Sequence, residues 1–387
     1  TPFTGSEMVM EPSTTSTYNT YTWFTVWDAV ADTDINLQFK TLVGSNTVTA
    51  DQLTLFAMNL DEDLTENSDW FFVNDTSSTT LSSSWSTVNN AEITFTPSGP
   101  TKDYLVMTTS QIDPGDLDRN YQSRLERSGE ASSVQPMFSQ EDEDLTNDRM
   151  IFTNFRVFEL NDESNTFREQ SRTDTTSSSS TREHSAVFAI NLEVFVNHAD
   201  AYTESETTLS TTDYVTEVQT LSISPEQSGS SWIMGSIASD ISLLNAYTKA
   251  RLQVNDVDQP STQTSDAYEQ EDSWDATDEL PLQYQTVETL STSSHTIDLD
   301  ASGEFTTNVE DRSLFVILLI LKQNRVFLSE NLGLSDAVER TEKLSLTEHL
   351  GISDSLSAIQ SKVILTENLG ITDAVARDAT VELTENL

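Results

Sequence analysis

The sequence predicts an all-β protein: tandem β-sandwich modules of jelly-roll type, followed by a C-terminal tail of β-repeats. Three observations support this prediction. Short segments rich in Val, Ile, Thr, Phe and Tyr alternate with turn residues, as is typical of strands. Two long stretches contain the same series of strand and turn patterns in the same order. The end of the chain repeats one phrase every 18 or 19 residues, with the two-residue period of extended strand.

The repeated landmarks define two copies of one module. Each copy has an alternating strand, a turn containing proline and a second strand; further along come a strand pair and a closing apolar strand. The corresponding segments are 89–113 and 217–241, then 152–171 and 282–301, then 185–196 and 313–322. We therefore predict full sandwich modules at 74–200 and 201–322, with jelly-roll-like topology.

The front of the chain matches only half of this module. WFTVWDAVADTDINLQFKTL (23–42) and LTLFAMNL (53–60) have the landmarks of its second half, while 1–22 is short and polar. The prediction is therefore a partial β-sandwich module at 1–73. No initiator Met or apolar leader precedes Thr1, so we expect either a removed signal peptide or part of a longer chain.

Two segments of the full modules allow another interpretation. ISLLNAYTKARLQV (241–254) has the best helical pattern, but its Thr, Tyr and Val content fits a strand equally well. LFVILLIL (314–321) is the most apolar run. A membrane-spanning helix needs about 20 residues, so this run predicts a buried strand. The acidic insertions at 139–149 and 255–279 are expected to be loops.

The charge balance limits the possible partners. The chain has 64 acidic and 19 basic residues, a net charge of −45. Nucleic acid is excluded as a natural partner because phosphate binding needs clustered Lys and Arg, and anionic membrane surfaces are disfavoured. Such self-repulsion indicates a protein that works in salt or with bound cations. Cysteine is absent, which excludes disulfides and Cys-based zinc sites. Abundant Ser and Thr with scarce Lys indicate an exported protein from a salty habitat.

The tail, 323–387, repeats the phrases LSENLGLSDAV (328–338), LTEHLGISDSL (346–356) and LTENLGITDAV (365–375). Their apolar residues share one parity, which indicates strand and not helix. Such a repeat suits one coil of a β-solenoid, whose stacked coils bury a shared core. It suits equally well strands that pair between chains in a fibre. Gly333, Gly351 and Gly370 recur where a bend or bulge would lie.

This phrase resembles the tandem LTE-x-L-x-I-[ST]-D-x-[VL] repeats of large secreted Ser/Thr-rich surface proteins of ammonia-oxidising archaea. The resemblance covers the tail alone. It implies an extracellular or cell-surface setting and carries no catalytic residues with it.

No catalytic motif is present. The sequence contains no GxSxG, GxGxxG, phosphate-binding loop or HExxH pattern. The histidines are scattered without a partner at ligand spacing, and we expect them at the surface: His184, His198, His295 and His349. Pairs of acidic residues, which serve glycosidases, occur throughout so acidic a chain and therefore carry no information. We predict that the chain is not an enzyme.

Calcium is the one cofactor for which the sequence offers candidate ligands. Stacked repeats would align tail carboxylates in ladders, which Ca²⁺ would relieve, and acidic loops supply further oxygen ligands. The alternative is a solvated acidic surface. The candidates are Asp61, Asp63, Asp142, Asp144, Asp272, Asp275, Asp278, Glu348 and Glu367. DLDASGE (298–304) begins like an EF-hand loop but lacks its final Glu, so a hairpin turn is expected there. Asn74 begins an Asn-x-Thr sequon in a predicted loop.

These features together favour a structural subunit of an extracellular filament, sheath or appendage. Copies of the chain would join head to tail if surplus tail strands completed the open half-module of the next subunit. The alternative is an adhesin, or a virion fibre or decoration protein, that binds a cell surface or glycan, for which Tyr268 and Trp274 are the aromatic candidates. The expected location is extracellular or at a cell surface, or else at a virion surface.

Overall fold

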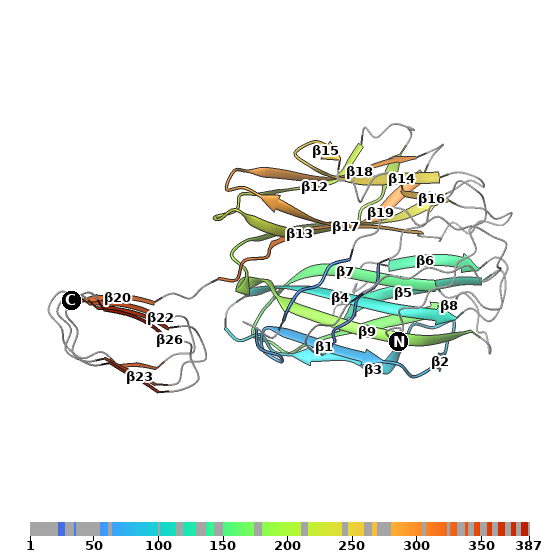
Figure 1. Ribbon diagram of the computed structural model, residues 1–387. Helices are drawn as coiled ribbons and strands as arrows, with labels where there is room; N and C mark the ends of the chain where they lie inside the picture. The colour runs from blue at the N-terminus through green and yellow to red at the C-terminus, as the bar shows by residue number, and fades with distance from the viewer. Residues whose placement is uncertain are drawn as a thin grey trace. The chain divides into compact units, whose positions relative to one another are not determined.

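The computed structural model divides into two compact units, residues 1–320 and 321–387. It describes residues 22–27, 35, 55–60, 64–99, 101–113, 119–128, 137–142, 150–173, 180–209, 216–241, 247–258, 265–268, 280–303 and 307–322. In the tail it describes the backbone of the seven strands given below. These residues form strands and one short 3₁₀ helix, and no α-helix occurs among them. The predicted all-β class is confirmed (Figure 1).

The first sandwich has two antiparallel sheets. One sheet has the order β1-β9-β4-β7, with β2 also paired to β9, and the other has the order β3-β8-β5-β6. The strands are β1 (Trp70–Asp75), β2 (Thr79–Thr80), β3 (Ser86–Phe95), β4 (Lys102–Asp113), β5 (Arg119–Arg127), β6 (Met137–Asp142), β7 (Met150–Leu160), β8 (Asn165–Thr173) and β9 (Thr181–Asn191). If β1 and β2 count as one strand, chain order gives sheets 1-8-3-6 and 2-7-4-5. This is the eight-stranded jelly roll with its two Greek keys.

The second sandwich repeats this topology. Its sheets have the orders β10-β19-β13-β17, with β11 beside β19, and β12-β18-β14, with β15 and β16 both beside β14. The strands are β10 (His198–Thr203), β11 (Thr207–Leu209), β12 (Thr216–Ile223), β13 (Gly229–Ile241), β14 (Tyr247–Val254), β15 (Val257–Asp258), β16 (Ser265–Tyr268), β17 (Leu280–Leu290), β18 (His295–Gly303) and β19 (Thr307–Leu318). The landmarks that indicated duplication therefore lie on equivalent strands: β3–β4 with β12–β13, β7–β8 with β17–β18, and β9 with β19.

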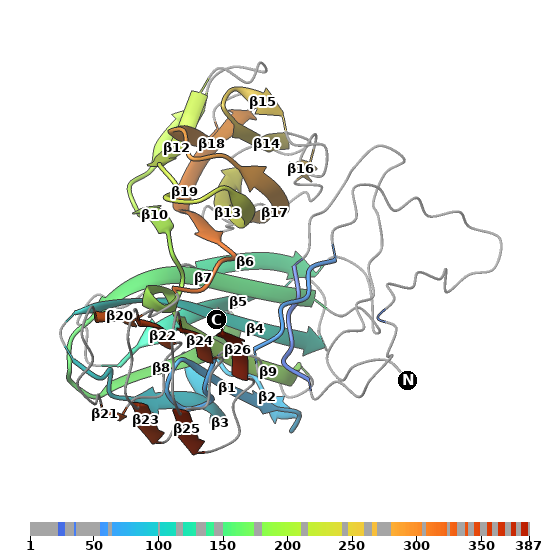
Figure 2. The ribbon, with the colours of Figure 1, turned by 60° about the vertical axis from the view of Figure 1, so that its left-hand side comes forward.

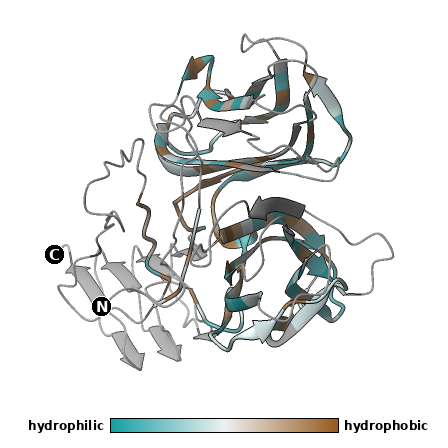
Figure 3. Ribbon diagram, turned by 90° about the vertical axis from the view of Figure 1, so that its right-hand side faces the viewer, coloured by the Kyte–Doolittle hydropathy of each residue, from teal (hydrophilic) through white to brown (hydrophobic). Residues whose placement is uncertain are grey.

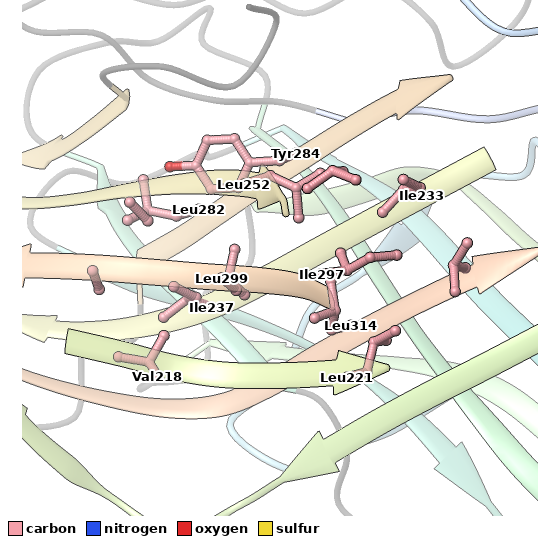
Figure 4. Close-up of a cluster of buried hydrophobic side chains, with 14 of the residues drawn as sticks. Val218, Leu221, Ile233, Ile237, Leu252, Leu282, Tyr284, Ile297, Leu299 and Leu314 are labelled. Carbon is pink, nitrogen blue, oxygen red and sulfur yellow. The ribbon is translucent and has the colours of Figure 1, made fainter. Parts of the chain in front are cut away.

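Each sandwich buries its own apolar core between its two sheets. Alternate residues of every strand point inward, so the two-residue period of the sequence becomes the core. In the second sandwich Ile233, Ile237, Leu252, Leu299 and Leu314 lie at the centre of this cluster (Figure 4). The first sandwich has a larger aromatic share, with Phe95, Tyr104, Phe158 and Phe167 in contact. Apolar stretches line the strands of both sandwiches (Figure 3).

An aromatic seam joins the two sandwiches. The outward-facing ring of Phe155 on β7 meets Phe315 on β19 edge to face, with 5.4 Å between ring centroids. Trp232 on β13 packs on the other side of Phe315 at 5.1 Å. All three side chains are buried, and Gln283 on β17 donates to the Thr153 carbonyl across the seam. One sheet of each sandwich therefore has buried apolar side chains on its outer face as well as on its inner face.

The stretch predicted as a half-module has a different structure where it is described. Residues 22–27 and 55–60 are irregular segments that cover the outer faces of the sandwich sheets. Phe24 packs on Phe188 of β9, and Phe56 stacks on Trp232 with 4.7 Å between ring centroids. These half-buried aromatic residues pack on strands of the sandwich sheets, and the described segments that carry them contain no strand. The expected boundary after residue 73 falls inside β1.

The tail strands form two parallel sheets, of order β20-β22-β24-β26 and β21-β23-β25 (Figure 2). They are β20 (Val326–Glu330), β21 (Ala337–Glu339), β22 (Leu344–Glu348), β23 (Asp354–Ser357), β24 (Val363–Glu367), β25 (Asp373–Ala376) and β26 (Val381–Glu385). Equivalent residues of successive repeats are opposite each other, for example Leu328, Leu346, Leu365 and Leu383. Each repeat therefore contributes one strand to each sheet, as in a coil of a β-solenoid.

Several local predictions can be compared with the structure. Of 241–254, the described residues belong to strands β13 and β14, and no helix is found among them. Residues 314–318 are a buried part of β19, as expected. Asp298 and Asp300 lie within β18, so the hairpin turn predicted at 298–304 does not begin there. The described residues contain no helix of the length and hydropathy needed to cross a bilayer.

The seam can be tested with Phe315→Ala. Phe315 is 1% exposed, and loss of a buried phenylalanine ring costs about 3–5 kcal/mol of unfolding free energy. We expect a loss in this range, measured by urea denaturation. Val257→Ala, at a 62% exposed position in the other sheet of the second sandwich, serves as the control and should change stability by no more than about 0.5 kcal/mol. Equal effects of the two substitutions would show that the seam does not stabilise the unit.

Candidate functional site

The linker between the sandwiches carries a cluster of three side chains that could bind a cation. Asp103 lies near the start of β4, Glu193 lies in the 3₁₀ helix η1 (Leu192–Val194), and His198 begins β10. One ligand atom from each residue lies within 4.8 Å of the other two. The closest pair is His198 Nε2 and Asp103 Oδ2, at 3.1 Å. All three side chains are half-buried.

Local hydrogen bonds fix this linker. The Asn191 side chain caps η1 by accepting from the Glu193 amide at 3.0 Å. The Val196 amide then donates to the Ile320 carbonyl, and the Leu318 amide donates to the Asn197 carbonyl. The chain therefore leaves the first sandwich through a capped turn and enters the second one already bonded to the end of β19.

Further charged and aromatic groups surround the cluster. The Arg156 guanidinium stacks on the Tyr202 ring, 4.1 Å from its centroid, and Tyr202 Oη donates to Asp311 Oδ1 at 2.7 Å. Asp311 has a positive φ of 39° and lies where β19 shifts register against β13; such a bulge re-aims side chains. Desolvation and the Asp311 carboxylate raise the pKa of Tyr202, so the phenol stays protonated.

In and around this cluster, carboxylates outnumber the groups that can carry a positive charge. Desolvation and then Asp103 raise the pKa of Asp200, while His198 and Arg156 lower it in part. An imidazole with two carboxylates is a ligand type used by Zn²⁺ and similar divalent ions. The same arrangement is also a hydrogen bond between β4 and β10, from His198 Nε2 to Asp103 Oδ2. Either way, it connects the first strand of the second sandwich to the first sandwich.

A second polar cluster is fully enclosed within the first sandwich. Glu169 on β8 and Arg182 on β9 are both 0% exposed, and Arg182 Nη1 donates to Glu169 Oε2 at 2.6 Å. The Ser185 hydroxyl donates to the same oxygen, and those of Ser123 and Ser171 donate to Oε1. A fully hydrogen-bonded carboxylate of this kind offsets much of the cost of burying a charge.

A β-bulge explains why an arginine points into this core. In the pairing of β4 with β9, Gln111 is opposite His184 but Ile112 is opposite Arg182. Glu183 is therefore an extra residue on β9, and it changes the side of the sheet to which the preceding side chain points. Arg182 and Ser185 consequently both face Glu169.

The jelly roll itself does not require this polar cluster. By strand register, the second sandwich has Ala250, Leu299 and Ala301 where the first has Ser123, Glu169 and Ser171. Nε and Nη2 of Arg182 have no hydrogen-bond partner among the described residues. Enclosed polar groups of this kind are commonly satisfied by buried water.

The structure places few of the predicted calcium ligands. Asp61, Asp63, Asp144, Asp272, Asp275 and Asp278 lie outside the described residues. Asp142 ends β6 and pairs by backbone with Arg119, in a strand and not a loop. Glu348 and Glu367 are opposite each other on β22 and β24, with Glu330 and Glu385 on the flanking strands. The tail glutamates thus occupy neighbouring positions of one ladder.

Two further expectations about sites need correction. Asn74 lies in β1 and not in a loop, although its side chain is exposed. His184 and His295 are buried, at 2% and 8% exposure, and His198 is half-buried, so these three are not surface histidines. His349 lies outside the described residues. His198 meets Asp103 from 95 positions away, and no local pattern in the sequence indicates that contact. The inward position of Glu169 could have been predicted from the sequence, because Glu169 is two residues after the apolar Phe167 and so lies on the same face of the strand.

No family model matches the chain, and no curated protein matches its sequence. Among solved structures the chain is similar to PNGase F, a glycosylasparaginase from Flavobacterium meningosepticum, with 11% identity, 65% of this chain and 96% of that chain covered, and a TM-score of 0.29. The STIV MCP has 10% identity, coverage of 65% and 97%, and a TM-score of 0.23. Infectious bursal disease virus, Gx strain, has 9% identity, coverage of 64% and 71%, and a TM-score of 0.22. Such low TM-scores give no argument about function.

The buried pair can be tested with Glu169→Leu, which introduces the residue of the second sandwich. Arg182 would remain as an uncompensated buried charge, and we expect a loss of about 3–5 kcal/mol of unfolding free energy. The double variant Glu169→Leu, Arg182→Leu should lose less, because no buried charge remains. Urea denaturation of both variants measures this difference. A double variant at least as unstable as the single one would contradict the argument.

His184 predicts a pH dependence of stability. Desolvation lowers the pKa of this buried side chain, and Asp75 opposes the shift in part. The unfolded chain takes up a proton below pH of about 6.5, whereas the folded chain does so only at lower pH. The free energy of unfolding is therefore unaffected by protonation of His184 above pH of about 6.5. It falls as pH drops from there toward the lowered pKa of His184 in the folded chain.

Each unit of difference between the two pKa values is worth about 1.4 kcal/mol. His184→Gln should therefore lose less stability than the parent between pH 7.5 and 5, measured as the shift in the urea midpoint. Identical pH profiles for the two proteins would show that His184 is not responsible.

Proposed function

We propose that this chain is a structural subunit of an extracellular assembly, a filament, sheath or appendage, that is built from copies of itself. The observation that carries the proposal is the register of the tail. Successive repeats pair in parallel, and equivalent residues are opposite each other. A repeat from another copy therefore matches the edge of the stack as well as a repeat of the same chain does.

The edge strand β20 is where such pairing would begin. Within the described tail, β20 pairs with β22 on one side only, so its other edge presents unpaired backbone N–H and C=O groups. A repeat of a second copy that pairs there makes a head-to-tail contact, which does not close on itself and extends into a fibre. The described part of residues 1–73 supplies no open half-sandwich, so the proposed route involves the tail alone.

The sandwiches suit the role of a rigid body attached to that tail. Jelly rolls serve as viral capsid and lectin domains, and this fold-level analogy is compatible with assembly but does not assign it. The aromatic seam provides the stiffness that a repeating subunit needs. Repulsion between chains of net charge −45 keeps single copies soluble until salt or cations screen the charge.

Calcium is proposed as the ion that favours assembly. The glutamates of β20, β22, β24 and β26 occupy one ladder, and neighbouring strands are about 4.8 Å apart. Like charges at this spacing are costly unless they are protonated or bridged, and Ca²⁺ takes carboxylate oxygens as ligands. Each added copy would lengthen the ladder, so the cost grows with assembly unless cations accompany it.

A second candidate function is an adhesin or virion fibre that binds a glycan. The jelly-roll topology of both sandwiches favours it, because lectin domains share that architecture. In this case single compact particles would bind a cell surface through their loops.

The proposal predicts that the full chain forms filaments and that a chain ending at Lys322 does not. Negative-stain electron microscopy with and without Ca²⁺ checks this, and filaments should be longer with Ca²⁺. The truncated chain keeps both sandwiches and is the matched control, with its folding verified by urea denaturation. Single compact particles from both chains would refute assembly through the tail and favour the adhesin function.

A further inference from the structure

The outer face of the sheet β3-β8-β5-β6 carries an unusual set of arginines. Strand register places Arg172 opposite Gln122, Arg124 opposite Gln170, and Arg168 opposite Glu126. These side chains alternate with the inward-facing core residues, so they share the outer face. Arg168 is compensated there, because it pairs with both Glu126 and Glu92.

Arg124 and Arg172 are not compensated in this way. Nε and Nη2 of Arg124 donate to Gln170 Oε1 at 2.8 and 2.6 Å, and Nε of Arg172 donates to Gln122 Oε1. Both partners are neutral amides, and within the described residues neither arginine forms an ion pair with a carboxylate. The remaining guanidinium N–H groups keep their capacity to donate.

One tryptophan holds these two guanidinium groups together. They lie 4.1 and 4.4 Å from the centroid of the Trp85 ring, Arg124 being the closer. Cation–π attraction stabilises each contact and fixes two like charges beside each other. Desolvation lowers the pKa of Arg124, Glu126 opposes this shift, and Arg172 adds to it. The shared ring contact and the half-buried positions of both arginines pre-organise the pair.

The duplicated module shows what a compensated version looks like. Arg251 occupies the position of Arg124 in the second sandwich, and the residue opposite it is Asp300 where the first sandwich has Gln170. Arg251 pairs with Asp300 at 2.9 Å and with Asp258 at 3.0 Å. An amide in place of this carboxylate thus leaves Arg124 without the cross-strand counter-charge that Arg251 has, and Arg172 adds a second guanidinium where the second sandwich has Ser302.

We infer that the face formed by Trp85, Arg124 and Arg172 binds carboxylate groups of a second copy of this chain. Charge complementarity supports this partner, because a chain of net charge −45 presents carboxylates to every neighbour, and here two guanidinium groups lie side by side with only neutral amide partners. Arg–carboxylate contacts are short, directional and bidentate, and a pre-organised pair loses little freedom on binding. The inference rests on the proposed function and adds a contact that is separate from the tail.

The test is Gln170→Glu in the full chain. The new carboxylate should pair with Arg124, as Asp300 pairs with Arg251, without loss of either arginine or of Trp85. Gln227→Glu is the matched control, since it makes the same chemical change at an exposed turn between β12 and β13. Sedimentation velocity at about 0.15 M salt, where charges are screened beyond about 8 Å, measures self-association. We expect Gln170→Glu to raise the dissociation constant about tenfold or more, with no change for the control.

Arg172→Gln is a second variant that does not depend on the new pair, and it should weaken association in the same direction. If both variants associate like the parent while the chain ending at Lys322 does not, the inference fails and tail-mediated assembly stands. If the parent stays monomeric, both proposals fail. If the parent binds heparin without self-association, and Gln170→Glu abolishes that binding, the face takes an anionic glycan, and the second copy is excluded as its partner.

Discussion

The sandwiches depend above all on alternation: along their strands, alternate side chains are buried between two antiparallel sheets. This constraint is met twice in the duplicated sandwiches, and it decides which side chains remain outside. Because the inner faces are filled, the outer face of one sheet in each sandwich is free to be apolar, and there Phe155, Trp232 and Phe315 make the seam. The irregular segments at 22–27 and 55–60 pack on the same two sheets, through Phe24 and Phe56.

The duplicated modules act as a natural comparison of what the fold requires and what it permits. Both copies keep the strand order and the core parity. They differ in polarity at two positions that do not affect topology. Inside the sandwich the first copy has Glu169 where the second has Leu299, and on the outer face the first has Gln170 where the second has Asp300. One copy has a polar centre and an uncompensated cationic face, whereas the other has an apolar centre and a compensated face. The fold therefore tolerates both polar and apolar side chains at these equivalent positions.

Sequence reasoning recovered what depends on short-range periodicity. The strands of the sandwiches and their equivalence between the two modules follow from a two-residue pattern and its recurrence. It failed where the structure depends on irregularity or on long-range contact. The bulge at Glu183 turns Arg182 inward, and His198 meets Asp103 only because the linker folds back onto β4. The half-module at 1–73 stays a prediction; in the described segments 22–27 and 55–60, Phe24 and Phe56 pack on sheets without belonging to a strand.

The parallel register of the tail has a consequence for how such a protein changes over generations. Since each coil presents nearly the same backbone edge and the same residues as the coil before it, gain or loss of one repeat leaves both ends of the stack chemically unaltered. A tail longer or shorter by one repeat of 18 or 19 residues would therefore present the same backbone edges as this one.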